Sequence, residues 1–519
     1  MRMTNKIMQN NSLYNINNNK ILQNKLSTMM STEKKITRPS DDPIIAIRAL
    51  RLRTSVTELT QFYEKNAPDA DSWLDVTGKS LITITEVFND MITQANKGAN
   101  KDLGPEDLEI ILEQLESLKN EYYSTGNVDY AGRYIFTGYR TDTTMSFTKE
   151  VEEQPDGYPS YQITEQNTIK DFDTVNVTDI GDLEGLNKSN YQDANYGNVV
   201  EQDIHNADVH RLRLSYDNLV GQKDLTSDLV IDVAGMQKQV KTVPLSEDPY
   251  LKVMNGAEDI VFIPETGEVL FSDKAYEQLE NEIRAAGGTD TEIKFTYTKN
   301  QWKDGDLRPE HYFACTSTTL NDDNTEKKIN YNQEYLLNQG KRQTIEYDVG
   351  YNQKIQVNTT ADEVFSHNMD RDIDDLKLAL ADLKAMDATV KDMDAVLDNL
   401  EEGTPEYKDV KKKYDAANKA YSYLREKVHK LFEGTITKVQ GYLDDTNVAI
   451  TDNGTRSQRL SLISNRLMDQ RTTFRTLQSE NEDADIAEVA VQLTSTELTY
   501  NAALMATGKI MQTSLMNYI

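Results

Sequence analysis

The chain has 519 residues, of which 38% are hydrophobic and 27% charged, with a formal net charge of -30. This length allows two to four domains, and the absence of an apolar run of 18 residues excludes a membrane-spanning helix. The single cysteine, Cys315, excludes an internal disulfide framework and a cysteine-based zinc site.

The charge is unevenly distributed along the chain. Residues 1–60 carry ten basic and four acidic side chains, whereas residues 151–350 carry 18 basic and 38 acidic ones. An acidic middle repels phosphate backbones, and the basic residues of the first segment are scattered, so we expect no nucleic-acid partner. The polar stretch NNSLYNINNNK near the N-terminus indicates that no cleaved secretion signal is present.

The first 30 residues are poor at forming an isolated helix. They contain eight asparagines, which at about 0.6 kcal/mol each oppose a lone helix by about 5 kcal/mol. Apolar residues nevertheless recur there at helical spacing, at Met3, Ile7, Tyr14 and Ile21. We therefore expect this segment to be mostly disordered in the monomer and to become helical only against partners in an assembly.

Residues 36–147 carry three amphipathic helical patterns. Their apolar stripes begin at Ala49, Leu74 and Leu108 and keep steps of three and four residues. Asp42 is placed to cap the first helix with Pro43 in its first position, and Pro105 begins the third. The loop before the first helix consists of Arg38, Pro39, Ser40, Asp41, Asp42 and Pro43. We expect Pro39 to end the preceding helix, and the charged loop residues to contact neighbouring subunits, the turn itself, or both.

Between about 148 and 350 the hydrophobic period changes from helical to two. Ile293, Phe295 and Tyr297 alternate with polar residues, and DIVFIPETGEVLFSD is typical of a hairpin with its turn at Pro264–Gly267. A second hairpin is predicted around Gly350, and a short helix over residues 275–286 that ends at two glycines.

The C-terminal third returns to helical spacing. One stripe keeps a heptad repeat through Ile373, Leu376, Leu380, Leu383, Val390, Met393, Leu397 and Leu400. EEGTPEYKD then interrupts it, which predicts a helical hairpin within 385–450, and residues 406–519 contain no proline and can be almost entirely helical. Asp485 is placed to cap the last helix, with Glu488 three residues later. That helix carries the apolar residues Leu493, Tyr500, Leu504, Ile510 and Leu515 and very few charges.

These patterns together predict a mainly α protein. Helices from the N- and C-terminal segments bury their stripes against each other in a rod-like bundle or coiled coil, and a β-rich domain is inserted between them.

Several long segments resemble the bacterial flagellin family. These are MRMTNKIMQNNSLYNINNNK, KKITRPSDDPIIAIRAL, SWLDVTGKSL, NVDYAGRYIFTGYRTDT, GTRSQRLSLISNRL and LTYNAALMATGKIMQTSLMNYI, in the family's order. The resemblance covers about 1–147 and 350–519. The form of the loop Arg38–Pro43, RYIFTGYRTDT and the ending SLMNYI are more similar to the hook–filament junction members than to filament flagellins.

The resemblance implies a layered structural subunit and no enzyme. Residues 1–35 plus 480–519 would form inner helices, 36–147 plus 355–479 a helical bundle, and 148–354 an outer β-rich domain. The implied role is to join the hook, through a neighbouring hook-associated protein, to flagellin, in a ring of like subunits. Family members leave the cell without signal cleavage, reach the extracellular flagellum, and are held by an export chaperone on the C-terminal helix. No cofactor or membrane partner is implied.

Three alternatives stay open. The chain could be a filament-forming flagellin, or more distantly a surface adhesin whose tyrosine-rich strands bind glycans. The segment EQDIHNADVH groups Glu201, Asp203, His205, Asp208 and His210, residue types that can hold a divalent ion. Acid-rich exposed loops often produce such groups without a metal. The sequence contains no HExxH, GxxxxGK(S/T), GxSxG or GxGxxG motif, so we expect no enzyme activity.

Overall fold

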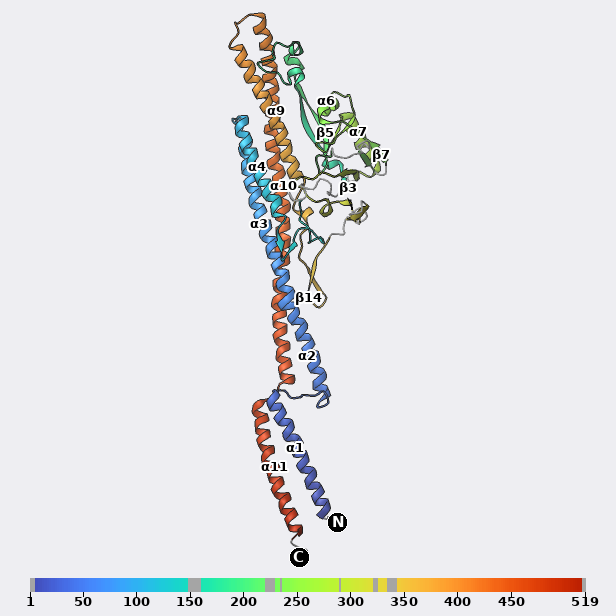
Figure 1. Ribbon diagram of the computed structural model, residues 1–519, viewed down its shortest axis with the longest axis vertical. Coiled ribbons are helices and arrows are strands. Elements are labelled where there is room, and N and C mark those ends of the chain that lie inside the picture. The colour runs from blue at the N-terminus through green and yellow to red at the C-terminus, as the bar shows by residue number, and fades with distance from the viewer. Residues whose placement is uncertain are drawn as a thin grey trace. The chain divides into compact units, whose positions relative to one another are not determined.

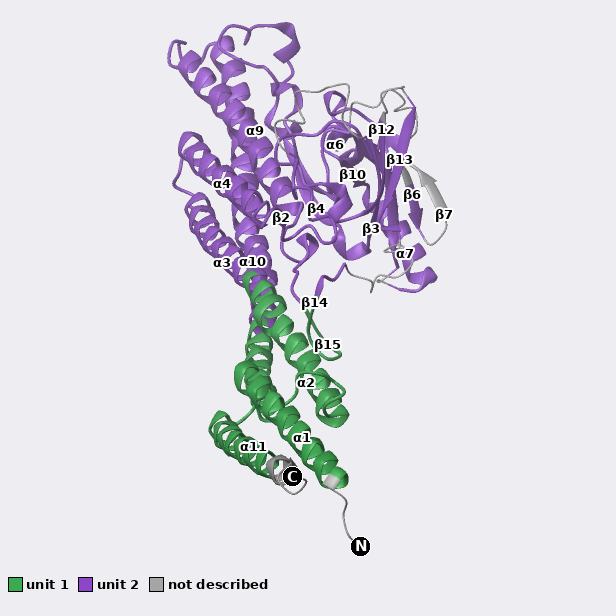
Figure 2. Ribbon diagram, turned by 60° about the horizontal axis from the view of Figure 1, so that its bottom comes forward, with its two compact units in different colours: residues 1–72, 347–355, 457–519 green, residues 73–346, 356–456 purple. Residues whose placement is uncertain are grey.

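The protein is mainly helical with a β-rich region between its long terminal helices, as predicted (Figure 1). The structure is a computed structural model that describes residues 5–147, 160–219, 229–233, 236–288, 291–320, 325–333 and 343–515. It divides into two compact units (Figure 2), the first made of residues 1–72, 347–355 and 457–519, and the second of 73–346 and 356–456. Over the described part of the chain, every helix is too short or too polar to cross a bilayer.

The first unit is built from helices at both ends of the sequence. α1 (Asn5–Thr32) lies beside α11 (Ile486–Leu515), as Figure 1 shows, and α2 (Pro43–Gln61) packs in the same unit as the end of α10 (Pro405–Glu482). A short π-helix, η1 (Phe62–Asn66), continues α2. The hairpin β14 (Glu346–Gly350) and β15 (Gln353–Gln356) confirms the turn predicted after Gly350.

The second unit contains a helical bundle. Its helices are α3 (Ala67–Gly98), α4 (Pro105–Thr125), α9 (Asn368–Leu397) and the first part of α10. Trp73, Phe88, Tyr122 and Phe432 are buried within the unit, which accounts for the strong apolar stripes of its helices. Pro105 is the first residue of α4, as predicted.

α9 and α10 form the helical hairpin predicted around Gly403. α9 ends at Leu397 and α10 begins at Pro405, where proline is favoured because the first helical amide needs no partner. Gly403 has φ 90, which favours glycine. The predicted stripe extends one position too far, because Leu400 lies beyond the end of α9.

Two sheets form the β-rich region. A five-stranded sheet has the order β4-β5-β10-β9-β8, and a six-stranded sheet the order β13-β12-β3-β11-β6-β7. The predicted hairpin is β9 and β10, which pair in antiparallel register, and the predicted helix is α7, which ends before Gly287. The element bounds are β1 (Asp129–Tyr130), β2 (Arg133–Tyr134), β3 (Ser160–Asn167), β4 (Asp173–Asp179), β5 (His205–Arg213), β6 (Val230–Val233), β7 (Met236–Gln239), β8 (Lys241–Thr242), α6 (Pro249–Met254), β9 (Ile260–Ile263), β10 (Glu268–Phe271), α7 (Asp273–Ala286), β11 (Ile293–Lys299), β12 (Ala314–Leu320) and β13 (Glu326–Tyr331).

A buried ionic network joins the five-stranded sheet to the helical bundle. Arg211 of β5 donates from Nε to Asp173 at 3.0 Å, from Nη1 to Glu268 at 2.8 Å and from Nη2 to Asp375 of α9 at 2.9 Å. Arg213 donates to Asp375 at 3.1 Å and to Asp372 at 2.7 Å. Because all of these charges are paired and hydrogen-bonded, the network can exist at low solvent exposure. It fixes the position of the five-stranded sheet on α9.

The network predicts how the second unit responds to acid. Burial alone would raise the pKa of Asp375, but Arg211 and Arg213 outweigh burial and lower that pKa to about 2. A pKa below the usual range means that the stabilising contribution is complete above about pH 4 and is lost as the pH falls toward 2. We expect Asp375→Asn to lower the free energy of unfolding by about 3 kcal/mol or more at pH 6, because it leaves buried guanidinium groups short of a counter-charge.

Urea unfolding at pH 6 and pH 3 measures both effects. The variant should lose less stability than the parent chain between these two pH values. Asp444→Asn, at an exposed position of α10, is the control. Equal losses in the two variants would show that the network contributes little.

Candidate assembly interface

The α1–α11 pair has very few buried side chains. In α1, Leu26 is buried, while Met8, Ile16 and Gln23 are half-buried on the same side. In α11, Val489 is buried and Leu493, Tyr500 and Ala503 are half-buried. Gln23 Nε2 of α1 donates a hydrogen bond to Glu497 Oε1 of α11 at 3.3 Å. Two helices of about thirty residues need a larger core than this to hold together in water.

Of the six predicted interface residues whose side chains the structure describes, four do not face the partner helix within the chain. Ile7, Tyr14 and Ile21 are exposed, and so is Leu504, whereas Leu493 and Tyr500 are half-buried. Met3 and the side chains of Ile510 and Leu515 lie outside what the structure describes. Sequence reasoning missed Met8, Ile16 and Leu26, because the positions between them on that face are Ser12, Asn19 and Gln23.

Both helices therefore carry an apolar stripe that faces solvent. Tyr14 and Ile21 of α1 are 67% and 59% exposed. On α11, Val491, Leu498 and Met505 recur every seven residues and are 71%, 73% and 72% exposed. Seven-residue spacing places them on one face, as a seam for another helix requires.

A backbone and ionic clamp connects the end of α1 to the junction between α10 and α11. The Lys35 amide donates to the Glu482 carbonyl at 2.7 Å, and the Ala484 amide donates to the Glu33 carbonyl at 2.9 Å. Glu482 is buried, and its carboxylate accepts from Arg53 Nε of α2 at 2.8 Å. Lys34 pairs with Asp483, and this hydrogen bond lowers the pKa of the Asp483 carboxyl. The clamp fixes where α1 ends and where α11 begins relative to α2.

The clamp also corrects the prediction that Pro39 ends the first helix. α1 ends at Thr32, because Glu33 takes the left-handed conformation with φ 58 and residues 33–35 then pair with 482–484. The loop from Arg38 to Ser40 is exposed.

The two aspartates of this loop organise the start of α2. Asp42 Oδ1 accepts from the amides of Ile44 at 2.9 Å and Ile45 at 3.1 Å, with Pro43 in the first turn, as predicted. Asp41 Oδ2 accepts from the Arg38 amide at 3.0 Å, and this hydrogen bond lowers the pKa of the Asp41 carboxyl. Asp485 caps α11 in the same way, through the amides of Ala487 and Glu488.

The acidic segment considered as a metal site does not gather its side chains around one point. His205 Nδ1 lies 2.9 Å from the Asp203 carbonyl oxygen, Asp208 accepts from Asn176, and His210 stacks on Tyr276. In the part of the chain that the structure describes, no group of three or more His, Cys, Asp or Glu side chains is arranged to hold a metal ion.

Comparison with known proteins gives matches in the N-terminal part of the chain. Residues 3–141 match the family model of the bacterial flagellin N-terminal helical region. The chain is 28% identical over 143 residues to flagellar hook-associated protein 3 of Salmonella typhimurium, and 27% identical over 144 residues to the Escherichia coli protein of the same name. These matches cover 27% and 28% of this chain and 45% of each relative, so the chain spans less than half the length of the relatives it matches.

Two of the solved structures that match the chain are named after flagellar hook-associated proteins. One is a putative flagellar hook-associated protein from Vibrio parahaemolyticus, at 10% identity and a TM-score of 0.36, covering 85% of this chain and all of that one. Another is flagellar hook associated protein-3 from Legionella pneumophila, at 9% identity and a TM-score of 0.31, covering 83% of this chain and 97% of that one.

The loop aspartates give a test that separates folding from contact between subunits. We expect Asp42→Ala to lower the free energy of unfolding by about 1 kcal/mol, because two amides at the start of α2 lose their acceptor. Asp42→Asn is the matched control, since asparagine caps equally well. Thermal unfolding of the monomer measures this effect.

The double variant Asp41→Ala/Asp42→Ala should impair assembly by more than its loss of monomer stability explains. Co-sedimentation with preformed filaments measures assembly, and the melting temperature of each variant measures the loss of monomer stability. Proportional losses would assign the loop to folding alone.

Proposed function

We propose that this chain is a structural subunit of the bacterial flagellum that joins the hook to the flagellin filament, and that it is not an enzyme. The observation that carries the proposal is the solvent-facing apolar stripe on both terminal helices. The match of residues 3–141 to the flagellin N-terminal model and the similarity to two hook-associated proteins support the choice of assembly.

The energetics favour a polymer of subunits over a free monomer. Burying one large aliphatic side chain contributes about 1.5–3 kcal/mol. Tyr14 and Ile21 of α1 and Val491, Leu498 and Met505 of α11 are more than half exposed. Their burial in an assembly would contribute on the order of 10 kcal/mol per subunit, which exceeds the about 5 kcal/mol by which the eight asparagines disfavour a helix in α1 relative to alanine.

We also propose the layers and partners that the resemblance to the flagellin family implies. The inner layer would be residues 1–35 plus 480–519, with Met3, Ile7, Tyr14, Ile21, Leu493, Tyr500, Leu504, Ile510 and Leu515 at contacts with like subunits. Residues 36–147 plus 355–479 would form the surrounding bundle, and 148–354 the outer domain. Partners would be a neighbouring hook-associated protein, flagellin and further copies in a ring, with an export chaperone on the C-terminal helix before export without signal cleavage to the extracellular flagellum.

Deleting the gene tests the role directly. We expect the deletion strain to secrete flagellin into the medium without forming filaments, because the hook then lacks the subunit on which flagellin polymerises. Electron microscopy of hooks and immunoblotting of the medium measure the two outcomes, and restoring the gene is the control. Filaments built from this chain itself would instead support the filament-flagellin alternative, and normal filaments in its absence would contradict the proposal.

The weak α1–α11 core gives a second prediction. We expect backbone amides of residues 5–30 to exchange with solvent at least a hundredfold faster in the monomer than those around Phe88, because α1 has almost no buried side chains. In the assembled protein the same amides should become protected. Hydrogen exchange with mass spectrometry measures both states, and strong protection of α1 in the monomer would show that this helix does not need an assembly.

A further inference from the structure

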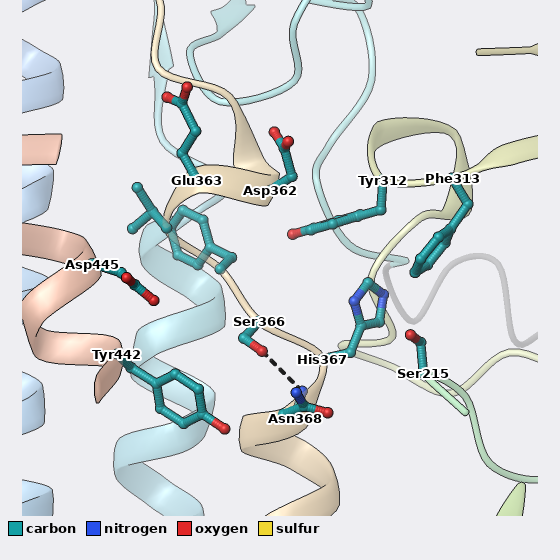
Figure 3. A pocket seen from close by; sticks show the side chains of 12 residues that line it. Ser215, Tyr312, Phe313, Asp362, Glu363, Ser366, His367, Asn368, Tyr442 and Asp445 are labelled. Atoms are coloured by element: carbon teal, nitrogen blue, oxygen red, sulfur yellow. Dashed lines mark hydrogen bonds between the residues drawn. The ribbon is translucent and has the colours of Figure 1, made fainter. Parts of the chain in front are cut away.

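The second unit contains a cavity of about 400 Å³ where the β-rich region meets the helical bundle (Figure 3). Tyr442 and Asp445 reach into it from α10, and Tyr312 from the opposite side, as Figure 3 shows. Phe313 and Phe365 add aromatic surface. The cavity is independent of the terminal helices on which the proposed assembly depends.

The charged side chains that line the cavity are all acidic. Asp362, Glu363 and Asp445 line it, and the described residues around it include no lysine or arginine. Glu363 is partly engaged, since it accepts from the Thr360 amide at 3.3 Å, whereas Asp362 and Asp445 are exposed to solvent. A cavity with this lining attracts a positively charged group.

The histidine of the cavity is a neutral acceptor. Burial lowers the pKa of His367 to about 3, so its imidazole carries no charge at neutral pH. Tyr216 Oη donates to the Leu307 carbonyl at 2.7 Å, so its proton is already in use. His367 Nε2, which lies 3.0 Å from Tyr216 Oη, must therefore be the protonated nitrogen. This tautomer leaves His367 Nδ1 with a free lone pair.

The tyrosines offer further acceptor positions. Tyr442 Oη donates its proton to Asp372 Oδ2 at 3.0 Å, which leaves its lone pairs available. The Tyr312 hydroxyl is buried and has no hydrogen-bond partner among the described residues, and Figure 3 shows it directed into the cavity. An unpartnered buried hydroxyl costs about 1–3 kcal/mol, which a bound donor would recover.

We propose that this cavity binds an alkylammonium group. An ammonium carries three donors, no acceptor and one positive charge, which complements acceptor-rich walls with carboxylates. The aromatic faces suit both the cation and the attached methylene groups. A free aliphatic amine and a lysine side chain of a second copy share this chemistry, and the cavity volume exceeds that of either.

Calorimetric titration of the full-length monomer with 1,4-diaminobutane tests the site. We expect saturable binding of this diamine and none of 1,4-butanediol at equal concentration, because the diol has the same chain without charge. Tyr312→Phe and Asp445→Asn should each weaken binding about tenfold or more. Asp444→Asn, at the neighbouring exposed position of α10, is the matched control and should bind like the parent chain.

Melting temperatures measured without the diamine show whether each variant is folded. Equal binding of the diol and the diamine would overturn the proposal, and so would unchanged binding by both Tyr312→Phe and Asp445→Asn.

Carbodiimide coupling distinguishes the two sources of the ammonium. This reagent joins a carboxylate and an amine in contact through an amide bond, while the carbodiimide takes up the lost water and becomes a urea. An amide between Asp445 and a lysine that forms only in assembled protein, found by mass spectrometry, assigns the site to a second copy and rests on the proposed assembly. Diamine binding without that amide assigns the site to a free amine. Absence of diamine binding would contradict the proposed site but would leave the proposed flagellar role unaffected.

Discussion

The structure depends on how little apolar surface the two terminal helices, α1 and α11, bury against each other. α1 and α11 meet along one narrow face each, on which Leu26 and Val489 are the buried apolar side chains that the structure describes. Each helix still carries a second apolar stripe, and a free chain has nothing to cover it. The clamp at Glu482 fixes the end of α1 and the start of α11, so these stripes are presented in a defined place before any partner arrives. A weak internal core and a fixed anchor are compatible, because the anchor uses backbone pairing and the ion pairs of Glu482 and Asp483 at one end of each helix.

The β-rich region is attached in a different way. Arg211 and Arg213 bring four carboxylates of the sheet and of α9 into one buried network. Such a network contributes less net stability than an apolar interface of the same size, but it allows few alternative arrangements. A domain inserted into a helical bundle needs one defined position on the bundle, because both of its ends are connected to bundle helices. The ion pairs supply that specificity, and Trp73, Phe88 and their neighbours supply the stability.

Much of this architecture was predictable from local patterns. Pro43, Pro105 and Pro405 each begin a helix, and the turn between β9 and β10 lies where Pro264 and Gly267 predicted it, because these residues restrict the backbone by themselves. The end of α1 was not predictable in this way. It is set by pairing of residues 33–35 with 482–484, a contact between distant parts of the sequence that no local pattern reports. The face of α1 that meets α11 was also missed, because Ser12, Asn19 and Gln23 interrupt its apolar residues.

The difference between the two faces of α1 bears on the role of its asparagines. A helix that had to be stable in the monomer would place its most apolar stripe toward its one available neighbour. In α1 the regular stripe of Ile7, Tyr14 and Ile21 points to solvent, and the mixed stripe faces α11. Eight asparagines in the first 30 residues lower the helix propensity further. We expect a sequence with both properties to be weakly ordered until several helices surround it, since only neighbours on more than one side cover both stripes at once. We therefore expect the low helix propensity of α1 to make the ordering of this segment conditional on assembly.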